Sequence, residues 1–336
     1  MVDNRAGRAS GVGSWPGTDV KEAFRTVLGE LGDPGIPHLT ELPARGPGSD
    51  LLGRGAVLLA EMAVDLQPSG WRFVSRPGRD LERARSMMRE DLDVLAEIAD
   101  GRTGPLKIQV TGPWTLAAGL HLPRLDVAAA DHGACRDIVE SLAEGVSRHV
   151  KEVRRLVPGA EVVVQVDEPS IQAVLAGDLP TASGFGRLRA VGEQVVQEGL
   201  GAVLGAARDA GAVETLVHCC AASPPTVLFD RAGADGVSVD LGLLTVGDWE
   251  TLAPALERGL RLWAGAVPVP PESRTTASVA DAVWTPWNRL TLDTGLLDAV
   301  VVTPACGLAT ATPATARAAM AAAIAGAREL GRRAEG

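Results

Sequence analysis

Eight short apolar segments, separated by longer helical patterns, constrain the fold of this chain most strongly. We expect strands over residues 9–15, 36–42, 106–111, 161–167, 213–217, 234–240, 260–267 and 300–304. The run Val162-Val163-Val164 in the fourth segment is typical of a strand that is buried on both faces. Strands that alternate with helices over 336 residues predict an α/β protein, a (β/α)8 TIM barrel that forms one domain over residues 1–336. An open, doubly wound sheet is the alternative.

The segments between the expected strands show apolar residues at helical spacing. One helix is expected over residues 50–66 and another over residues 185–210. Residues 71–75 could form a short extra strand or an ordered loop.

Polar side chains with useful chemistry follow nearly every expected strand. They are Ser14, Glu41, Thr111, Asp167 with Glu168, His218 with Cys220, Asp240 and Cys306. Active sites of TIM barrels lie at the C-terminal ends of the strands, so these side chains are expected to converge. Asp167 and Glu168 are neighbours, so only one of them can point into the barrel, and we favour Asp167.

His218 and Cys220 are the centre of a predicted metal site. The period of two in a strand puts both on one side of the chain and Cys219 on the other. Together with Asp240 and Cys306 they offer one nitrogen, two sulfurs and one oxygen, a ligand set that suits zinc. Packing alone could also place a His and a Cys at a strand end, and four protein ligands could close a purely structural zinc site.

The ligand set indicates what such a zinc ion would do. Two thiolates and one carboxylate around a divalent cation leave a charge of about −1, which makes the ion a poor activator of water. It suits instead a substrate thiol, which is mostly protonated at neutral pH when it is free. A thiol with amino-acid character would need Asp167, Glu168 or Glu41 for its ammonium group and Ser14 for its carboxylate. Turn and cap chemistry is the alternative role for Ser14 and Thr111.

Charge and cysteine content exclude several other classes of protein. The net charge is −10 and basic residues are scattered, so neither a nucleic acid nor an anionic membrane is expected as a partner. No run of eighteen apolar residues predicts a membrane span, and residues 1–8 lack the apolar core of a signal peptide. Four cysteines in a chain of this length do not form a disulfide framework, so we expect a cytoplasmic location.

Five motifs, spread over nearly the whole chain, resemble one known family. They are Val12-Gly13-Ser14-Trp15-Pro16, Val110-Thr111-Gly112-Pro113, Gln165-Val166-Asp167-Glu168-Pro169, His218-Cys219-Cys220 and Pro304-Ala305-Cys306-Gly307-Leu308. In this order they are similar to the catalytic domain of cobalamin-independent methionine synthase, in a short form with a single barrel. The resemblance implies a zinc-containing barrel that methylates homocysteine to methionine.

The resemblance also implies roles for individual residues. His218, Cys220 and Cys306 match zinc ligands, and Asp240 stands where the family has a glutamate. The positions that hold the amino acid are matched by Val12, Ser14 and Asp167, and Asp167 is the expected catalytic residue. Glu41 is our nominee for a second carboxylate that binds the amino group.

The sequence departs from the family pattern in ways that concern the methyl donor. The full-length enzymes carry a second, N-terminal barrel, and they have a histidine after the seventh strand where residues 264–272 contain none. The donor is therefore expected to be either a methylfolate or a methyl-corrinoid protein. Two other functions stay open: methyl or alkyl transfer to another thiol such as coenzyme M, and zinc binding without turnover.

Overall fold

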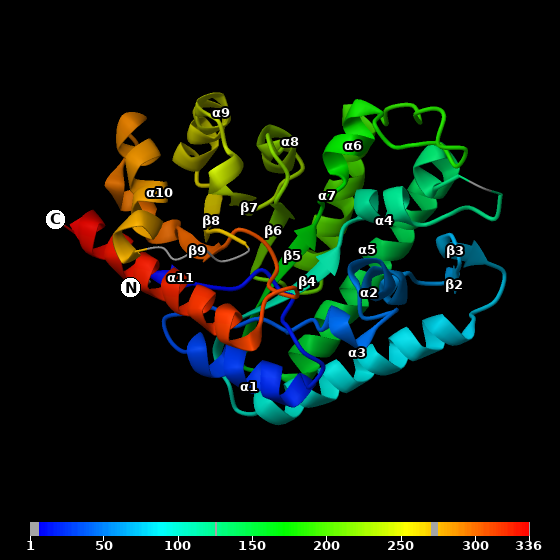
Figure 1. Ribbon diagram of the computed structural model, residues 1–336, viewed down its shortest axis with the longest axis horizontal. Coiled ribbons are helices and arrows are strands. Elements are labelled where there is room, and N and C mark those ends of the chain that lie inside the picture. The colour runs from blue at the N-terminus through cyan, green and yellow to red at the C-terminus, as the bar shows by residue number, and fades with distance from the viewer. Residues whose placement is uncertain (1–6, 125, 270–274, 336) are drawn as a thin grey trace.

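Parallel strands lie in the middle of the molecule and helices surround them (Figure 1). The computed structural model describes residues 7–124, 126–269 and 275–335. The main sheet has seven strands in the order β1-β9-β8-β7-β6-β5-β4, and all neighbouring strands are parallel. They are β1 (Arg8–Ala9), β4 (Gly104–Thr111), β5 (Ala160–Asp167), β6 (Glu214–Cys219), β7 (Gly236–Asp240), β8 (Arg261–Val267) and β9 (Val301–Pro304).

Residues 36–41, in the second expected strand, join the two edges of this sheet. The N–H of Ile36 donates to a β1 carbonyl (2.9 Å), and the N–H of Leu39 donates to the carbonyl of Lys107 in β4 (2.9 Å). Pro37 has no N–H to donate, so the segment pairs through isolated bridges and not as a continuous strand. This pairing closes the sheet, which confirms the (β/α)8 TIM barrel and rules out the open sheet.

The helices lie outside the barrel, and short 3-10 turns occupy several loops (Figure 1). The described α-helices are α1 (Val20–Glu30), α2 (Leu51–Leu58), α3 (Arg79–Ile98), α4 (Pro113–Gly119), α5 (His132–Leu156), α6 (Ile171–Ala176), α7 (Glu193–Asp209), α8 (Thr226–Arg231), α9 (Val246–Glu257), α10 (Thr276–Arg289) and α11 (Pro313–Glu335). The 3-10 turns are η1 (Pro43–Arg45), η2 (Ala128–Ala130), η3 (Leu241–Leu243) and η4 (Thr294–Ala299). None of the described helices is long and apolar enough to cross a membrane.

Two of the expected helices were wrong in extent. The helix predicted over residues 50–66 stops at the end of α2, and Glu61 then takes a left-handed conformation (φ 58°) that a helix does not accommodate. An antiparallel hairpin of β2 (Ala63–Gln67) and β3 (Gly70–Val74) follows, so the extra strand near residue 71 is present. The helix predicted from residue 185 begins only with α7, because the residues before it pair across a turn: Arg187 forms an antiparallel bridge with Pro180, and the N–H of Leu188 donates to the carbonyl of Leu179 (2.8 Å).

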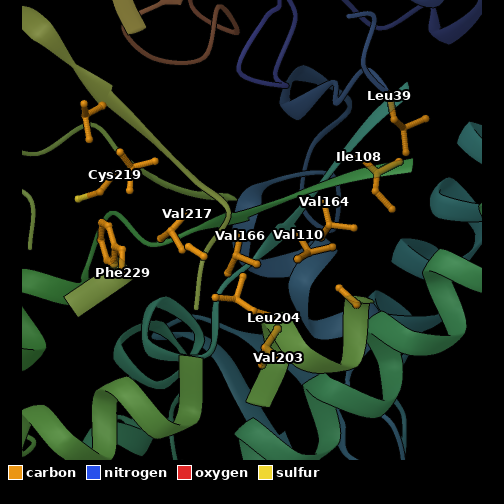
Figure 2. Close-up of a cluster of buried hydrophobic side chains, with 14 of the residues drawn as sticks. Leu39, Ile108, Val110, Val164, Val166, Val203, Leu204, Val217, Cys219 and Phe229 are labelled. Atoms are coloured by element: carbon orange, nitrogen blue, oxygen red, sulfur yellow. The ribbon is translucent and has the colours of Figure 1, made fainter. Parts of the chain in front are cut away.

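Side chains alternate along each strand between an outer and an inner core. The outer core lies between the strands and the helices: Figure 2 shows Val164, Val166 and Val217 of the sheet on the side of Val203 and Leu204 from α7. The inner core fills the N-terminal half of the barrel with five buried apolar side chains. These are Ile36, Val163, Leu216, Trp263 and Val301. We call them the apolar plug; toward the C-terminal ends of the strands the inward positions become polar.

Candidate metal and substrate site

Three of the four predicted metal ligands meet at the C-terminal end of the barrel. The ligand atoms of His218, Cys220 and Cys306 all lie within 4.8 Å of one another, and the two Sγ atoms are 3.1 Å apart. His218 lies in β6, Cys220 directly follows that strand, and Cys306 follows β9. The chain therefore brings a nitrogen and two sulfurs, from segments 86 residues apart, to one point.

The surroundings of His218 fix which ring nitrogen faces the sulfurs. Nδ1 lies 3.2 Å from the carbonyl oxygen of Ser238 and 3.0 Å from its Oγ. A metal-binding histidine usually donates its other ring N–H to such an oxygen, so Nε2 is the nitrogen available to a metal. Cys219, by contrast, is fully buried in the outer core with Phe229 of α8, which confirms that it faces away from the site (Figure 2).

The two thiols share a hydrogen bond, and this sets their charges. The hydrogen bond from Cys220 and the nearby His218 lower the pKa of Cys306, although burial opposes this. The same hydrogen bond and burial raise the pKa of Cys220. Cys306 is thus the group that ionises first, and a cation would be needed to keep both sulfurs as thiolates.

These three side chains fit zinc, which binds thiolate and imidazole ligands in most protein sites. The structure does not bring Asp240, the fourth predicted ligand, into the cluster. Asp240 is half-buried, burial raises the pKa of its carboxyl group, and its Oδ1 accepts the N–H of Gly242 (2.8 Å) at the start of η3. Three protein ligands leave a coordination position for a substrate, as catalytic zinc sites do.

A cavity of about 240 Å³ lies directly against the cluster. It is lined by Val12, Gly13, Ser14, Glu41, Pro43, Leu51, Asp167, Pro169, His218, Cys220, Cys306 and Gly307. Carboxylates therefore share one cavity with the sulfurs, as the amino-acid thiol hypothesis requires.

Asp167 and Glu168 separate as the strand alternation predicts. Asp167 lines the cavity and accepts a hydrogen bond at Oδ1 from Nε2 of Gln165 (2.7 Å), and burial raises the pKa of its carboxyl group. Glu168 is fully buried on the other side, where it accepts the N–H groups of Trp114 (2.9 Å) and Thr115 (2.8 Å) at the start of α4. Burial raises the pKa of Glu168 to about 7. The structure thus gives Glu168 a helix-capping position outside the cavity and not the predicted substrate contact.

Glu41 and Thr111 occupy different positions although both were predicted to bind substrate. Glu41 lines the cavity, and its Oε1 accepts a hydrogen bond from Nε of Arg54 (3.0 Å), which also pairs with the buried Asp91. Thr111 is buried, does not line the cavity, and its Oγ1 donates to the carbonyl of Leu51. Thr111 therefore ties β4 to the start of α2, a contact that is neither turn nor cap chemistry.

Ser14 and Val12 lie at the wall formed by the N-terminal segment. The Ser14 side chain is half-buried, and its carbonyl accepts the N–H of Leu308 (3.0 Å). A Cβ on Gly307 would lie 2.1 Å from Ser14 Oγ, so any larger residue there would displace the Ser14 hydroxyl from its position at the cavity. The carbonyl of Val12 accepts a hydrogen bond from Nζ of Lys107 (2.6 Å).

Sequence reasoning missed a buried polar layer directly beneath the cavity. Lys107, Gln109 and Gln165 are buried at inward strand positions, between the apolar plug and the cavity. Burial lowers the pKa of Lys107, while Asp167 and Glu41 oppose this. The signal was present as polar residues at every second position of β4, between Leu106, Ile108 and Val110.

Comparison with known proteins identifies the family of the chain. The family model described as the catalytic domain of cobalamin-independent synthase matches residues 8–329. The chain belongs to this family. Comparison with curated proteins gives no match. The predicted resemblance to the cobalamin-independent synthase catalytic domain is thus confirmed.

A solved structure related to the cobalamin-independent synthases shares the fold. It is a B12-independent methionine synthase from Shewanella sp. W3-18-1 in complex with selenomethionine. The TM-score is 0.61 at 15% identity, and the match covers 97% of this chain and 98% of that chain. A phosphonomutase from Burkholderia cenocepacia J2315, at 16% identity, covers 67% of this chain and 69% of that chain with a TM-score of 0.33, too low for any argument.

The segment where the resemblance places a histidine is described only in part. Residues 264–269 belong to β8 and the turn after it, and no histidine occurs there. Residues 270–272, the remainder of that stretch, lie outside the described residues.

Proposed function

We propose that this protein transfers a methyl group to the thiol of homocysteine and forms methionine, with zinc bound by His218, Cys220 and Cys306. The observation that carries the proposal is the shared cavity, where two cysteine sulfurs and a histidine face the same space as Asp167 and Glu41. Membership of the cobalamin-independent synthase family supports the same reaction.

The residues of the cavity would hold the two ends of the substrate. The carboxylates of Asp167 and Glu41 would bind the ammonium group, and Ser14 with the backbone of Gly13 would bind the carboxylate. The thiol end would then lie at His218. Bound by its three protein ligands, zinc would lower the pKa of the substrate thiol and so supply a nucleophilic thiolate at neutral pH.

The chemical step is a displacement at the methyl carbon. The substrate sulfur loses its proton and attacks that carbon; a sulfur–carbon bond forms, and the bond to the donor breaks with its electron pair on the donor. The cavity wall contributes by orientation, because a sulfur held close to its electrophile gains much of the advantage of an intramolecular reaction. The buried hydrogen bonds of Asp167 and Glu41 would keep the ammonium group, and thereby the whole substrate, in one position.

An amino-acid thiol agrees better with the cavity than a thiol sulfonate such as coenzyme M. Two carboxylates line the cavity, and their negative charge favours a substrate with an ammonium group. The methyl donor is either a methylfolate or a methyl-corrinoid protein.

The test is methionine formation by the zinc-loaded protein with homocysteine and each donor in turn. We expect turnover with one donor class, and slower turnover when coenzyme M replaces homocysteine. The Cys219→Ala variant should form methionine at the wild-type rate, because the Cys219 side chain faces away from the cavity. Tight zinc binding with no methionine formed from any donor would refute methyl transfer and favour a zinc-binding protein without turnover.

A further inference from the structure

Lys107 is a fully buried lysine in the centre of the barrel. Its Nζ lies 2.6 Å from the Val12 carbonyl oxygen, 2.8 Å from Oε1 of Gln165 and 3.4 Å from Oε1 of Gln109. An ammonium group has three protons and no acceptor, so these three oxygens use its full hydrogen-bonding capacity. A buried charge with this many directed partners is costly to keep for packing alone.

The donor-only character of Lys107 fixes the side-chain amide of Gln165. Because Lys107 can only donate, the oxygen of the Gln165 amide must face it and the NH₂ group must face the other way. That NH₂ group lies 2.7 Å from Oδ1 of Asp167 and 2.9 Å from the Val12 carbonyl, which are both acceptors. In this series of hydrogen bonds each N–H donor therefore faces an oxygen that accepts.

This series of hydrogen bonds ends at the carboxylate of Asp167, which lines the cavity. Oδ1 of Asp167 is held by Gln165, whereas Oδ2 has no hydrogen-bond partner among the described residues. The amide thus sets the rotation of the carboxylate and leaves one oxygen for a ligand. Without Lys107 the buried oxygen of the Gln165 amide would lose its donor, and only the contacts of the NH₂ group to Asp167 and to the Val12 carbonyl would hold the amide.

We propose that Lys107 is a positioning residue that, through Gln165, holds Asp167 in the orientation that receives the substrate's ammonium group. Discrimination between an amino-acid thiol and the same thiol without its amino group then depends on Lys107, a residue that lies beneath the cavity wall. The inference rests on the proposed function, because it takes homocysteine as the substrate.

The test compares homocysteine with 4-sulfanylbutanoate, which is homocysteine without the amino group. Binding of each thiol to the zinc-loaded protein is measured by calorimetry for wild type, Lys107→Met and Gln165→Leu. We expect the dissociation constant of homocysteine to rise about tenfold or more in both variants, as loss of a hydrogen bond to a charged group implies. The dissociation constant of 4-sulfanylbutanoate should change less than about twofold, because this thiol has no ammonium group for Asp167 to bind.

Two further variants make the result specific. Gln109→Leu removes another partner of Lys107, but Gln109 donates to the Leu39 carbonyl and not to Asp167, so the preference for homocysteine should persist. The double variant Lys107→Met/Gln165→Leu should bind homocysteine no more weakly than either single variant, since both substitutions act through the carboxylate of Asp167. If Lys107→Met does not fold, Gln165→Leu still tests the route to Asp167: a preference for homocysteine that persists in this variant would overturn the inference.

Several outcomes would overturn the inference. Equal weakening of both thiols would show that Lys107 only supports the structure, and unchanged binding of both would show that it does not act on Asp167. Wild-type protein that binds the two thiols equally would instead refute the proposed function, and the inference with it.

Discussion

The two halves of the barrel interior use the same strands for opposite purposes. On β5 the inward side chains are Val163, then Gln165, then Asp167; on β6 they are Leu216 and then His218. The first residue of each series belongs to the apolar plug, and the last lines the cavity. Two or four residues along a strand, about 7 to 13 Å, separate a side chain that packs from one that can bind a ligand.

This difference shows how the barrel separates stability from chemistry. Burial of the apolar plug stabilises the folded state, and the plug gives the strands a rigid base. The cavity residues lose hydration on burial and need the partners that the polar layer supplies, such as Gln165 for Asp167. Substitutions in the two halves should therefore change different measurements.

The largest effect is expected from Cys220→Ala in the cavity half. Loss of one of the two sulfurs should lower the rate of methionine formation at least about a thousandfold, because stabilisation by a bound metal contributes several kcal/mol. The thermal unfolding of the metal-free protein should hardly change, because this side chain is only half-buried. Rate assays and calorimetry on the same samples provide the check.

Cys219→Ala is the control for that variant. It removes a neighbouring sulfur of the outer core, so zinc content and rate should stay near wild type while stability falls slightly. An inactive Cys219→Ala beside an active Cys220→Ala would reverse the assignment of the two faces of β6.

Leu216→Ala should give the opposite result in the apolar plug. Leu216 is fully buried two residues before His218, and its truncation should lower the free energy of unfolding by about 2–5 kcal/mol. Zinc stoichiometry and the KM for homocysteine should persist at temperatures where the variant is folded. Loss of zinc with unchanged stability would contradict the separation of the two halves.

The adjacent carboxylates Asp167 and Glu168, at the end of β5 and directly after it, provide a smaller contrast. Asp167→Asn should raise the KM for homocysteine about 10- to 100-fold, because an amide does not attract an ammonium group as a carboxylate does. Glu168→Gln should leave KM unchanged and lower stability by about 1–3 kcal/mol, because an NH₂ group would face the donors at the start of α4. Steady-state kinetics and urea unfolding distinguish the two, and a raised KM in Glu168→Gln alone would be incompatible with the alternation.

The smallest effect concerns a buried histidine outside the barrel. Burial and the charge of Arg54 lower the pKa of His149 on α5 to about 4. Between pH 6.5 and 4 the unfolded chain binds a proton that the folded protein does not, so stability falls as the pH falls. His149 should account for about 1 kcal/mol of the loss between pH 7.5 and 5.5, and His149→Gln should remove that part of the dependence. Urea unfolding at the two pH values measures it; an unchanged slope in the variant would mean that the histidine is not buried in its neutral form.

Much of the fold could be predicted because burial imposes a simple pattern on the chain. The alternation of strands and helices identified the barrel, and β5 and β7 end at the predicted Asp167 and Asp240. The errors lie where local patterns are ambiguous. The apolar run that ends α2 does not reveal that β2 follows, and Pro37 prevents the second strand from forming a continuous ladder.

The candidate site could be predicted in part for the same reason. Strand ends placed His218, Cys220 and Cys306 together, because the C-terminal ends of β6 and β9 lie on one face of the barrel. The position of Asp240 depends on a local hydrogen bond to Gly242, and the polar layer around Lys107 depends on partners from distant segments. Periodicity places Lys107 and Gln109 on the inward face of β4, but it does not show which side chains meet, and both features depend on that.

X-ray absorption at the zinc edge, with and without homocysteine, tests the central claim most directly. For the zinc-loaded protein we predict two sulfur neighbours at about 2.3 Å and nitrogen or oxygen neighbours at about 2.0–2.1 Å. Homocysteine should raise the number of sulfur neighbours from two to three. A zinc shell without sulfur, or a sulfur count that homocysteine leaves unchanged, would contradict a zinc ion that is bound by Cys220 and Cys306 and receives the substrate thiol.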